Sequence, residues 1–261
     1  MRYFVHIGYN GYRYNGWQKQ PNLLNVQGII EQKLTEALKT PVEIIGCGRT
    51  DTHVHASQFF FHMDIGEEWT YDLSFRLNKL LPPTIAVFDI IPVEAHRHAR
   101  FDAVLRSYDY YLHTYKNPFL HHISSYYPYP ELDFSKMQEA AALLPKYKDY
   151  RAFCTSPDKY EHTRCNVMSA QLHFDSSGQK MRFQISANRF LGKMIRIIMG
   201  ELLKVGQHRL STDEFEHYLN SRTTPKLLSP AHPEGLYLSK VSYPYLNLPP
   251  RTDFAQPFLI I

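Results

Sequence analysis

The sequence has few cysteines and no long hydrophobic run. Its 261 residues include only three cysteines, which are widely spaced: Cys47, Cys154 and Cys165. This pattern argues against a disulfide framework or a cysteine-based zinc site, and it favours free thiols in a reducing, cytoplasmic setting. No apolar run approaches the ~20 residues of a membrane-spanning helix. The opening stretch MRYFVHIGYNGYRYNGW lacks the apolar core of a signal peptide, so we expect no membrane segment.

Composition indicates a globular protein with a local basic region. Hydrophobic residues make up 44% and charged residues 21% of the chain, proportions typical of a folded protein. The length suits one large domain or two of ~130 residues each. Net charge is only +4, but residues 178–210 hold seven Lys or Arg and one acid, Glu201. With 14% aromatic residues, this favours a nucleic-acid partner, although a solvated basic face fits the charge equally well.

Hydrophobic periodicity predicts a βαββαβ order in the first half of the chain. Alternating apolar residues indicate strands and a period of about 3.6 indicates helices, with Asn25 as the N-cap of the first helix. The predicted elements are a strand over 3–9, a helix over 26–38, strands over 43–47 and 57–63, a helix over 72–80 and a strand over 85–93. This order is that of the ferredoxin-like unit, whose antiparallel sheet can present one open face.

The second half repeats this order without repeating the sequence. Ser135–Gln138 and Ser211–Glu214 are predicted capping boxes, and the second opens an additional helix. The other predicted elements are a strand over 106–114, a helix over 135–144, strands over 166–174 and 180–186, a helix over 189–205 and a strand over 236–243. We therefore predict an α+β fold of two ferredoxin-like units, 1–104 and 105–248, with a tail over 249–261. Side by side, such units would form an extended antiparallel sheet with a long concave surface.

The predicted helix 189–205 combines an apolar side with a basic side. A helical projection gathers four cations on one side, namely Arg189, Lys193, Arg196 and Lys204. Glu201 falls among the apolar positions and breaks the pattern. The basic side is either an RNA-binding stripe or the solvated face of a surface helix.

The stretch GCGRTDTHVHA (46–56) concentrates chemically active side chains. Four of them fall within seven positions: Arg49, Asp51, His53 and His55. Gly46 and Gly48 are expected to provide the backbone freedom for a tight turn. Asp51 is either a turn former or, with an arginine two positions away, a carboxylate kept ionised for chemistry. Spacing alone leaves both interpretations open.

This loop and four further blocks resemble the tRNA pseudouridine synthase I (TruA-type) family. GRTDTHVHASQ is similar to the family signature GRTDAGVHA. The other blocks are GYNGYRYNGWQKQPNLLNVQGIIEQKL, RHARFDAVLRSYDYYL, ANRFLGKMIRIIMGELLKVG and SPAHPEGLYLSKVSY. The matches are collinear from residue 8 to residue 243, nearly the whole chain.

The resemblance implies isomerisation of uridine to pseudouridine in tRNA, at positions 38–40 of the anticodon stem-loop, without a metal or an organic cofactor. Asp51 matches the family's essential aspartate, which acts as a nucleophile or as a base at the ribose. Arg196 matches the arginine that keeps this carboxylate ionised, and Tyr108 matches the tyrosine that stacks on the extruded uracil. Arg49 would fill the vacated space or contact the RNA backbone, and Leu236 matches an apolar pocket position.

The same resemblance implies a central RNA-binding cleft and a homodimer that holds one tRNA. Arg189, Lys193, Lys204 and Arg100 are expected to contact RNA, with Phe101 as a further candidate near the pocket. We expect tRNA as the partner of a cytoplasmic protein, with no metal and no membrane.

Thr52-His53 stand where the family signature has Ala-Gly, and this departure leaves the target position open. The histidine could change the backbone of the loop or add a base contact, and a paralogue that modifies another RNA site would carry the same core. Two other classes compete. One is a metal-dependent hydrolase that uses Asp51 with His53, His55 and His62. The other is a non-catalytic RNA-binding module, which would be insensitive to replacement of Asp51.

Overall fold

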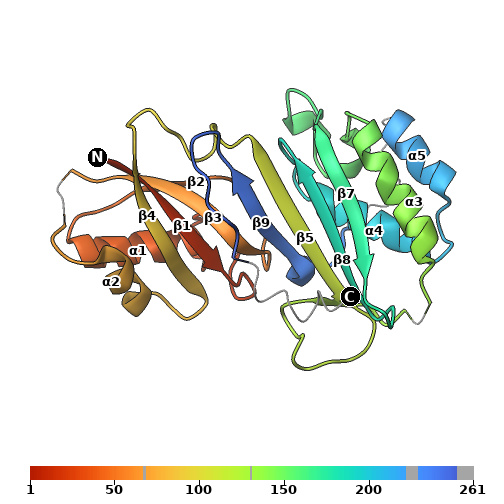
Figure 1. Ribbon diagram of the computed structural model, residues 1–261, viewed down its shortest axis with the longest axis horizontal. Helices are drawn as coiled ribbons and strands as arrows, with labels where there is room; N and C mark the ends of the chain where they lie inside the picture. Colours follow the sequence, from red (N-terminus) through yellow and green to blue (C-terminus); the bar gives the residue numbers. More distant parts are fainter. Residues whose placement is uncertain (67–68, 130, 222–228, 252–261) are drawn as a thin grey trace. The chain divides into compact units, whose positions relative to one another are not determined.

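The computed structural model describes the chain apart from residues 67–68, 130, 222–228 and 252–261. The chain divides into two compact units (Figure 1). Unit 1 contains Met1–Val104 and the segment that starts at Tyr237, and unit 2 contains Leu105–Leu236. Each unit combines strands with helices, which confirms the predicted α+β class. Most of the predicted tail, from residue 252 on, lies outside the described residues.

Unit 1 is built on an antiparallel sheet with the strand order β4-β1-β3-β2. These strands are β1 (Arg2–Tyr9), β2 (Ile44–Gly46), β3 (His55–Asp64) and β4 (Ile85–Val93). Strand β9 (Leu236–Ser242) pairs in parallel with the start of β3, where Tyr237 lies opposite His55. Alternation buries one face because Val5 and Ile7 lie opposite Phe61 and Phe59, and all four are inaccessible to solvent.

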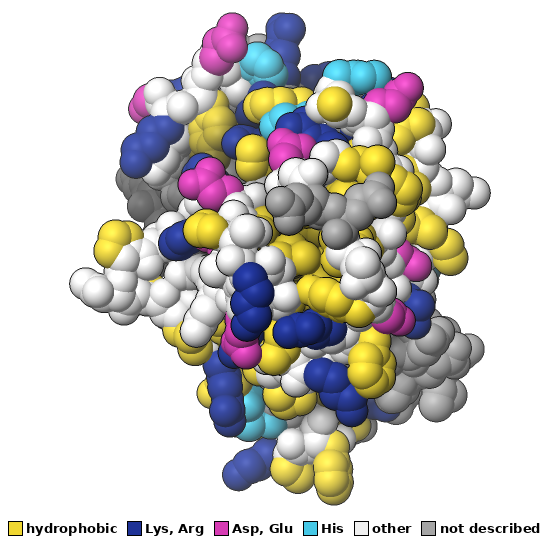
Figure 2. Space-filling view, turned by 90° about the vertical axis from the view of Figure 1, so that its left-hand side faces the viewer, with side chains coloured by type: hydrophobic (Ala, Val, Ile, Leu, Met, Phe, Trp, Pro, Cys, Tyr) yellow, Lys and Arg dark blue, Asp and Glu magenta, His cyan; other side chains and the backbone are white. Residues whose placement is uncertain are grey.

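The helices of unit 1 are α1 (Val26–Leu38) and α2 (Leu73–Leu80), which contact each other. Asn25 caps α1 as predicted, since its side chain accepts a hydrogen bond of 2.8 Å from the Gly28 amide. Figure 2 looks onto the side of unit 1 where β4, α1 and α2 lie, and there basic and acidic side chains are interspersed with hydrophobic ones.

The second face of the unit 1 sheet is covered by the segment that follows β9, residues 243–251, here named the strap. Tyr243 packs edge to face on Phe4 of β1, with ring centroids 5.2 Å apart. Gln58 of β3 binds both β9 and the strap: it accepts from the Val241 amide of β9 at 2.9 Å and donates to the Leu248 carbonyl of the strap at 3.3 Å. The strap therefore buries a face that the ferredoxin-like pattern alone would leave open.

In unit 2, β8 (Lys180–Ala187) lies between β5 (Leu105–His113) and β7 (Val167–Phe174), antiparallel to both, and β6 (Ser125–Tyr126) pairs with β5 in parallel. Helix α3 (Phe134–Leu143) contacts α4 (Met194–Gly206) and α5 (Thr212–Ser221). Short 3-10 turns are η1 (Leu144–Lys146), η2 (Arg151–Phe153), η3 (Pro157–Lys159) and η4 (Pro233–Gly235). Within the described part of the chain, none of the helices is both long and apolar enough to span a membrane.

Two local predictions in unit 2 were wrong. The helix expected over 189–205 begins only at Met194, because Lys193 adopts a left-handed conformation with φ of 60°. Residues 188–193 instead form an irregular connection from β8, so Arg189 does not lie on the helix. The predicted capping box at Ser135 is replaced by an aspartate cap, since Asp133 accepts from the Lys136 amide at 2.9 Å.

The other capping box is confirmed at the start of α5. The Ser211 amide donates to Glu214 Oε2 at 2.8 Å, and the Glu214 amide donates back to Ser211 Oγ at 3.1 Å. The reciprocal pair fixes the additional helix before β9.

Candidate active site

The loop that carries Asp51 is held by backbone and side-chain bonds to the N-terminal loop, residues 10–17. The Trp17 amide donates to the Thr50 carbonyl at 3.2 Å, and the buried Thr50 hydroxyl lies 2.9 Å from the Tyr9 hydroxyl. Trp17 itself is buried against Phe59 of β3, with ring centroids 4.0 Å apart. The residue directly before Asp51 is thus anchored to the core of unit 1.

Two glycines of the N-terminal loop allow it to lie close to the loop of Asp51. A Cβ added to Gly11 would lie 1.9 Å from the Val54 carbonyl oxygen, and one added to Gly16 would lie 2.3 Å from the Thr50 carbonyl oxygen. Gly16 also has φ of +77°, a region that L side chains rarely adopt. The sequence-based role for Gly46 and Gly48 was wrong, because the positive φ within the Asp51 loop belongs to His53, at 66°.

His53 fills the left-handed position of the loop and binds the N-terminal loop twice. Its amide donates to the Tyr14 carbonyl at 3.1 Å, and its ring Nδ1 contacts the Tyr12 carbonyl oxygen. The turn closes through the Val54 amide, which donates to the Asp51 carbonyl at 3.2 Å. Asp51 itself is half-buried, whereas the side chain of Arg49 is exposed. The loop therefore presents both side chains from a fixed backbone.

The histidines around Asp51 have separate structural partners. His55 is buried, accepts from the Gly11 amide at its Nδ1 (3.0 Å) and stacks on Tyr237 with centroids 4.4 Å apart. His62 accepts from the Ala99 amide at 3.2 Å. Among the residues that the structure describes, no group of three or more His, Cys, Asp or Glu side chains is arranged to hold a metal ion.

In unit 2, Tyr108 lies on β5 opposite Ile185 of β8 and is half-buried. Its ring meets Phe190 edge to face, with centroids 5.1 Å apart. The guanidinium of Arg106, two residues earlier, donates to the Asn188 carbonyl at 3.2 Å. The irregular connection 188–193 is thereby tied to the strand that carries the tyrosine.

Arg196 lies in the first turn of α4 and is oriented by the backbone before β9. Its Nε donates to the Ala231 carbonyl at 2.7 Å, and the Ala231 amide donates to the Arg196 carbonyl at 2.8 Å. Gly200 allows α4 to lie this close to the backbone before β9, since a Cβ at Gly200 would lie 2.0 Å from the Ser229 carbonyl oxygen. Leu236, five residues beyond Ala231, is buried at the start of β9.

The predicted basic stripe is divided among different environments. Arg189 lies over the Tyr160 ring at 5.9 Å, and Lys193 is exposed at the N-terminus of α4. Lys204, near the other end of the helix, forms an ion pair of 2.7 Å with Glu201. Glu201 is the acid that broke the apolar pattern. It is buried, and its charge is paired with that of Lys204 in the same helix. The i,i+3 spacing of Glu201 and Lys204 was the feature of the sequence from which this ion pair could have been predicted.

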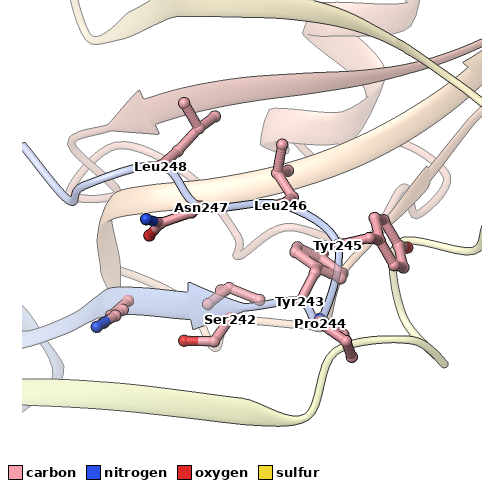
Figure 3. A pocket seen from close by; sticks show the side chains of 9 residues that line it. Ser242, Tyr243, Pro244, Tyr245, Leu246, Asn247 and Leu248 are labelled. Atoms are coloured by element: carbon pink, nitrogen blue, oxygen red, sulfur yellow. The ribbon is translucent and has the colours of Figure 1, made fainter.

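The three cysteines are free and buried, which confirms the prediction of free thiols. An open pocket of about 430 Å³ lies in unit 1 between β9 and the strap (Figure 3). Residues 240–248 line it, and they include none of the predicted site residues. What the sequence did not reveal is the support around Asp51, above all the contact of Gly11 with Val54. The glycine-rich motif GYNGYRYNGW was its only signal.

Comparisons with known proteins agree with this arrangement of motifs. A family model described as tRNA pseudouridine synthase matches residues 140–244. Three relatives are each described as tRNA pseudouridine synthase A. The protein of Porphyromonas gingivalis is 40% identical over 93% of this chain and 97% of its own length. That of Parabacteroides distasonis is 41% identical over 93% and 96%, and that of Streptococcus sanguinis is 33% identical over 93% and 98%.

These matches run through both units, so they include the Asp51 loop of unit 1 as well as the β5 and α4 segments of unit 2. The chain belongs to the tRNA pseudouridine synthase family.

Proposed function

We propose that this protein isomerises uridine to pseudouridine in the anticodon stem-loop of tRNA, at positions 38–40, with Asp51 as the catalytic carboxylate. The observation that carries the proposal is the anchored loop: Thr50 and Val54, on either side of Asp51, are both held against the N-terminal loop. A carboxylate on a fixed backbone suits a reaction in which positioning within ~0.5 Å matters.

The reaction breaks the bond between ribose C1′ and uracil N1 and forms a bond between C1′ and C5. The C5 proton leaves and N1 gains a proton, so atoms and charge balance without a redox partner. Asp51 acts either as a nucleophile at C1′ or as a base at the ribose, and both routes need an ionised carboxylate. Because a paired base is out of reach of a carboxylate, the target nucleotide is extruded first.

The remaining roles follow from the matched motifs and from local geometry. Arg196, whose guanidinium is oriented by the Ala231 carbonyl, is assigned as the cation that favours the ionised form of Asp51. Tyr108 is assigned to stack on the extruded uracil and to assist removal of the C5 proton. Exposed Arg49 would take the vacated space in the RNA, and Leu236 would form an apolar wall.

Arg189 and Lys193 are proposed to contact tRNA phosphates, and Arg100 to contact the RNA elsewhere. Lys204 is the weakest of the proposed RNA contacts, since its charge is already paired with buried Glu201. We also propose that both units are ferredoxin-like, an assignment that the β4-β1-β3-β2 order of unit 1 supports, and that a cytoplasmic homodimer holds one tRNA.

Tritium release from tRNA transcripts labelled at C5 of uridine tests the proposal. We expect release with the wild-type protein and its abolition in Asp51→Asn, with tRNA binding retained. Thr52→Ala, an exposed neighbour, serves as the matched control and should retain activity. Tritium release that persists in Asp51→Asn would show that Asp51 is not the catalytic carboxylate.

The same assay separates the rival functions. Binding of tRNA without release from any transcript, in wild type and Asp51→Asn alike, would indicate a non-catalytic RNA-binding module. Release that maps to a uridine outside positions 38–40 would indicate a paralogue with another target.

A further inference from the structure

The connection between β4 and β5 presents an aromatic side chain to solvent. Phe101 is 75% exposed, and Arg100 beside it is also exposed. A single exposed apolar side chain is common on protein surfaces, so its significance depends on how it is held and on what lies beside it.

The turn that carries Phe101 is closed by its own hydrogen bonds. The His98 amide donates to Asp102 Oδ2 at 2.9 Å, and the Asp102 amide donates to the His98 carbonyl at 3.1 Å. The His98 ring accepts at Nδ1 from the amides of Arg100 (3.1 Å) and Phe101 (3.3 Å). The turn therefore has one defined backbone conformation.

Side chains of β3 and the strap anchor the same turn. The Ala99 amide donates to His62 of β3, and the Ala99 carbonyl accepts from the Tyr243 hydroxyl at 2.7 Å. Asp102 accepts from the Tyr245 hydroxyl at 2.7 Å. Figure 3 shows these two tyrosines flanking the reversal of the strap at Pro244. The strap thus covers the sheet of unit 1 and also supports the turn that carries Phe101.

The protonation states of the two histidines fit this role. Burial and the nearby charge of Arg2 lower the pKa of His98, and they lower that of His62 to about 4. Both rings are therefore neutral near pH 7 and keep the lone pair with which each accepts a backbone N–H. A charged ring could not accept at Nδ1.

The surface that results has the chemistry of a base-stacking site. The His98 ring stacks on Phe101 with centroids 4.2 Å apart, and the Arg100 guanidinium lies 5.8 Å from the Phe101 centroid. An aromatic face suits any nucleobase, and a cation beside it suits the adjoining phosphate.

This surface is remote from the loop that carries Asp51. His62, which holds the turn, is seven positions along β3 from His55, which follows the loop. At the rise of a β-strand this separation is about 23 Å. With this separation, an RNA that reaches both places must contact them with different nucleotides.

We propose that Phe101, with Arg100 and His98, forms a docking platform that stacks an unpaired base of tRNA at a distance from the target uridine. The proposal rests on tRNA as the substrate. It assigns to the platform a share of tRNA affinity rather than a part in bond breaking.

The test compares Phe101→Ala and Phe101→Trp with the wild type, using an unmodified full-length tRNA transcript. Dissociation constants and single-turnover rates at saturating tRNA are measured for each. We expect Phe101→Ala to bind roughly tenfold more weakly, in keeping with the loss of one base–aromatic stack, and its saturated rate to fall by less than its affinity. Phe101→Trp, which keeps an aromatic face, should retain affinity.

Phe75 on α2 is a matched control. It is 62% exposed, belongs to the same unit and has a cation, Lys79, 5.5 Å from its ring centroid. Phe75→Ala should bind tRNA as the wild type does. Affinity within twofold of wild type for Phe101→Ala, or an equal loss in Phe75→Ala, would overturn the platform.

Sedimentation of each variant completes the test. A change of oligomeric state in Phe101→Ala would assign the ring to a contact with a second copy of the chain and would also overturn the proposal. Failure of the wild type to modify tRNA would instead defeat the proposed function, so the two failures are distinguishable.

Discussion

The ring of His53 stacks on the ring of Tyr12, with centroids 5.4 Å apart and planes 29° from parallel, and its Nδ1 contacts the Tyr12 carbonyl oxygen. His53 does this from a left-handed backbone conformation, two residues beyond Asp51. The backbone here has the conformation that glycine adopts most easily, and the side chain adds a contact that glycine lacks. The histidine thus joins the loop of Asp51 to the N-terminal loop.

His53→Ala is expected to be less stable than His53→Gly by about 1 kcal/mol, because alanine bears the cost of a left-handed backbone and glycine does not. Both lose the contact with Tyr12, so their difference isolates the backbone. Denaturant titration of the two variants measures it. Equal stability would show that the loop relaxes out of the left-handed conformation when the ring is removed.

Gly11→Ala is expected to slow the reaction at saturating tRNA by tenfold or more, since its Cβ would lie 1.9 Å from the Val54 carbonyl oxygen and must displace the loop of Asp51. Gly48→Ala is the matched control for stability, because a Cβ there meets nothing within 4 Å. Single-turnover rates and denaturant titrations check both variants. A Gly11→Ala protein with a wild-type rate would show that the contact between the loops does not position Asp51.

Much of this architecture could be predicted from periodicity, because burial of alternate or helically spaced side chains is a local property. The strand predicted over 85–93 is β4, residue for residue, and the cap at Asn25 is where the sequence placed it. The start of α4 could not be read in this way, since apolar residues continue on both sides of Lys193 and only its left-handed backbone ends the irregular segment.

The surroundings of the candidate site were harder to predict than its residues. Motif resemblance picked out Asp51, but its support comes from Gly11 and Trp17, which are distant in sequence and bind through backbone atoms. Apart from the glycines that permit the close approach, backbone contacts of this kind leave no trace in side-chain patterns. The resemblance named Arg100 and Phe101, but the support of their turn was equally hidden, because it depends on Tyr243 and Tyr245 from the other end of the chain.

His62 should make the fold sensitive to acid. Its pKa in the folded protein, about 4, lies below the ordinary value of 6.5, so the unfolded chain takes up a proton first as the pH falls. The stabilisation is complete above pH 6.5 and is lost as the pH falls towards 4, which amounts to about 2 kcal/mol between pH 7.5 and pH 5. His62→Gln, whose amide oxygen can still accept from Ala99, should have a shallower dependence of unfolding free energy on pH. Parallel curves for the two proteins would contradict this assignment.

Lys204 and Lys193 should respond in opposite ways to removal of their charge. Lys204→Met leaves the buried carboxylate of Glu201 without its partner at 2.7 Å, and we expect a loss of about 2 kcal/mol in unfolding free energy with little change in tRNA affinity. Lys193→Met removes an exposed cation and should weaken tRNA binding, with a lower dependence on salt, at unchanged stability. Denaturant titration and tRNA binding at two salt concentrations measure both effects. If Lys204→Met weakened binding as much as Lys193→Met without loss of stability, Lys204 would belong to the RNA surface and its pairing with Glu201 would be incidental.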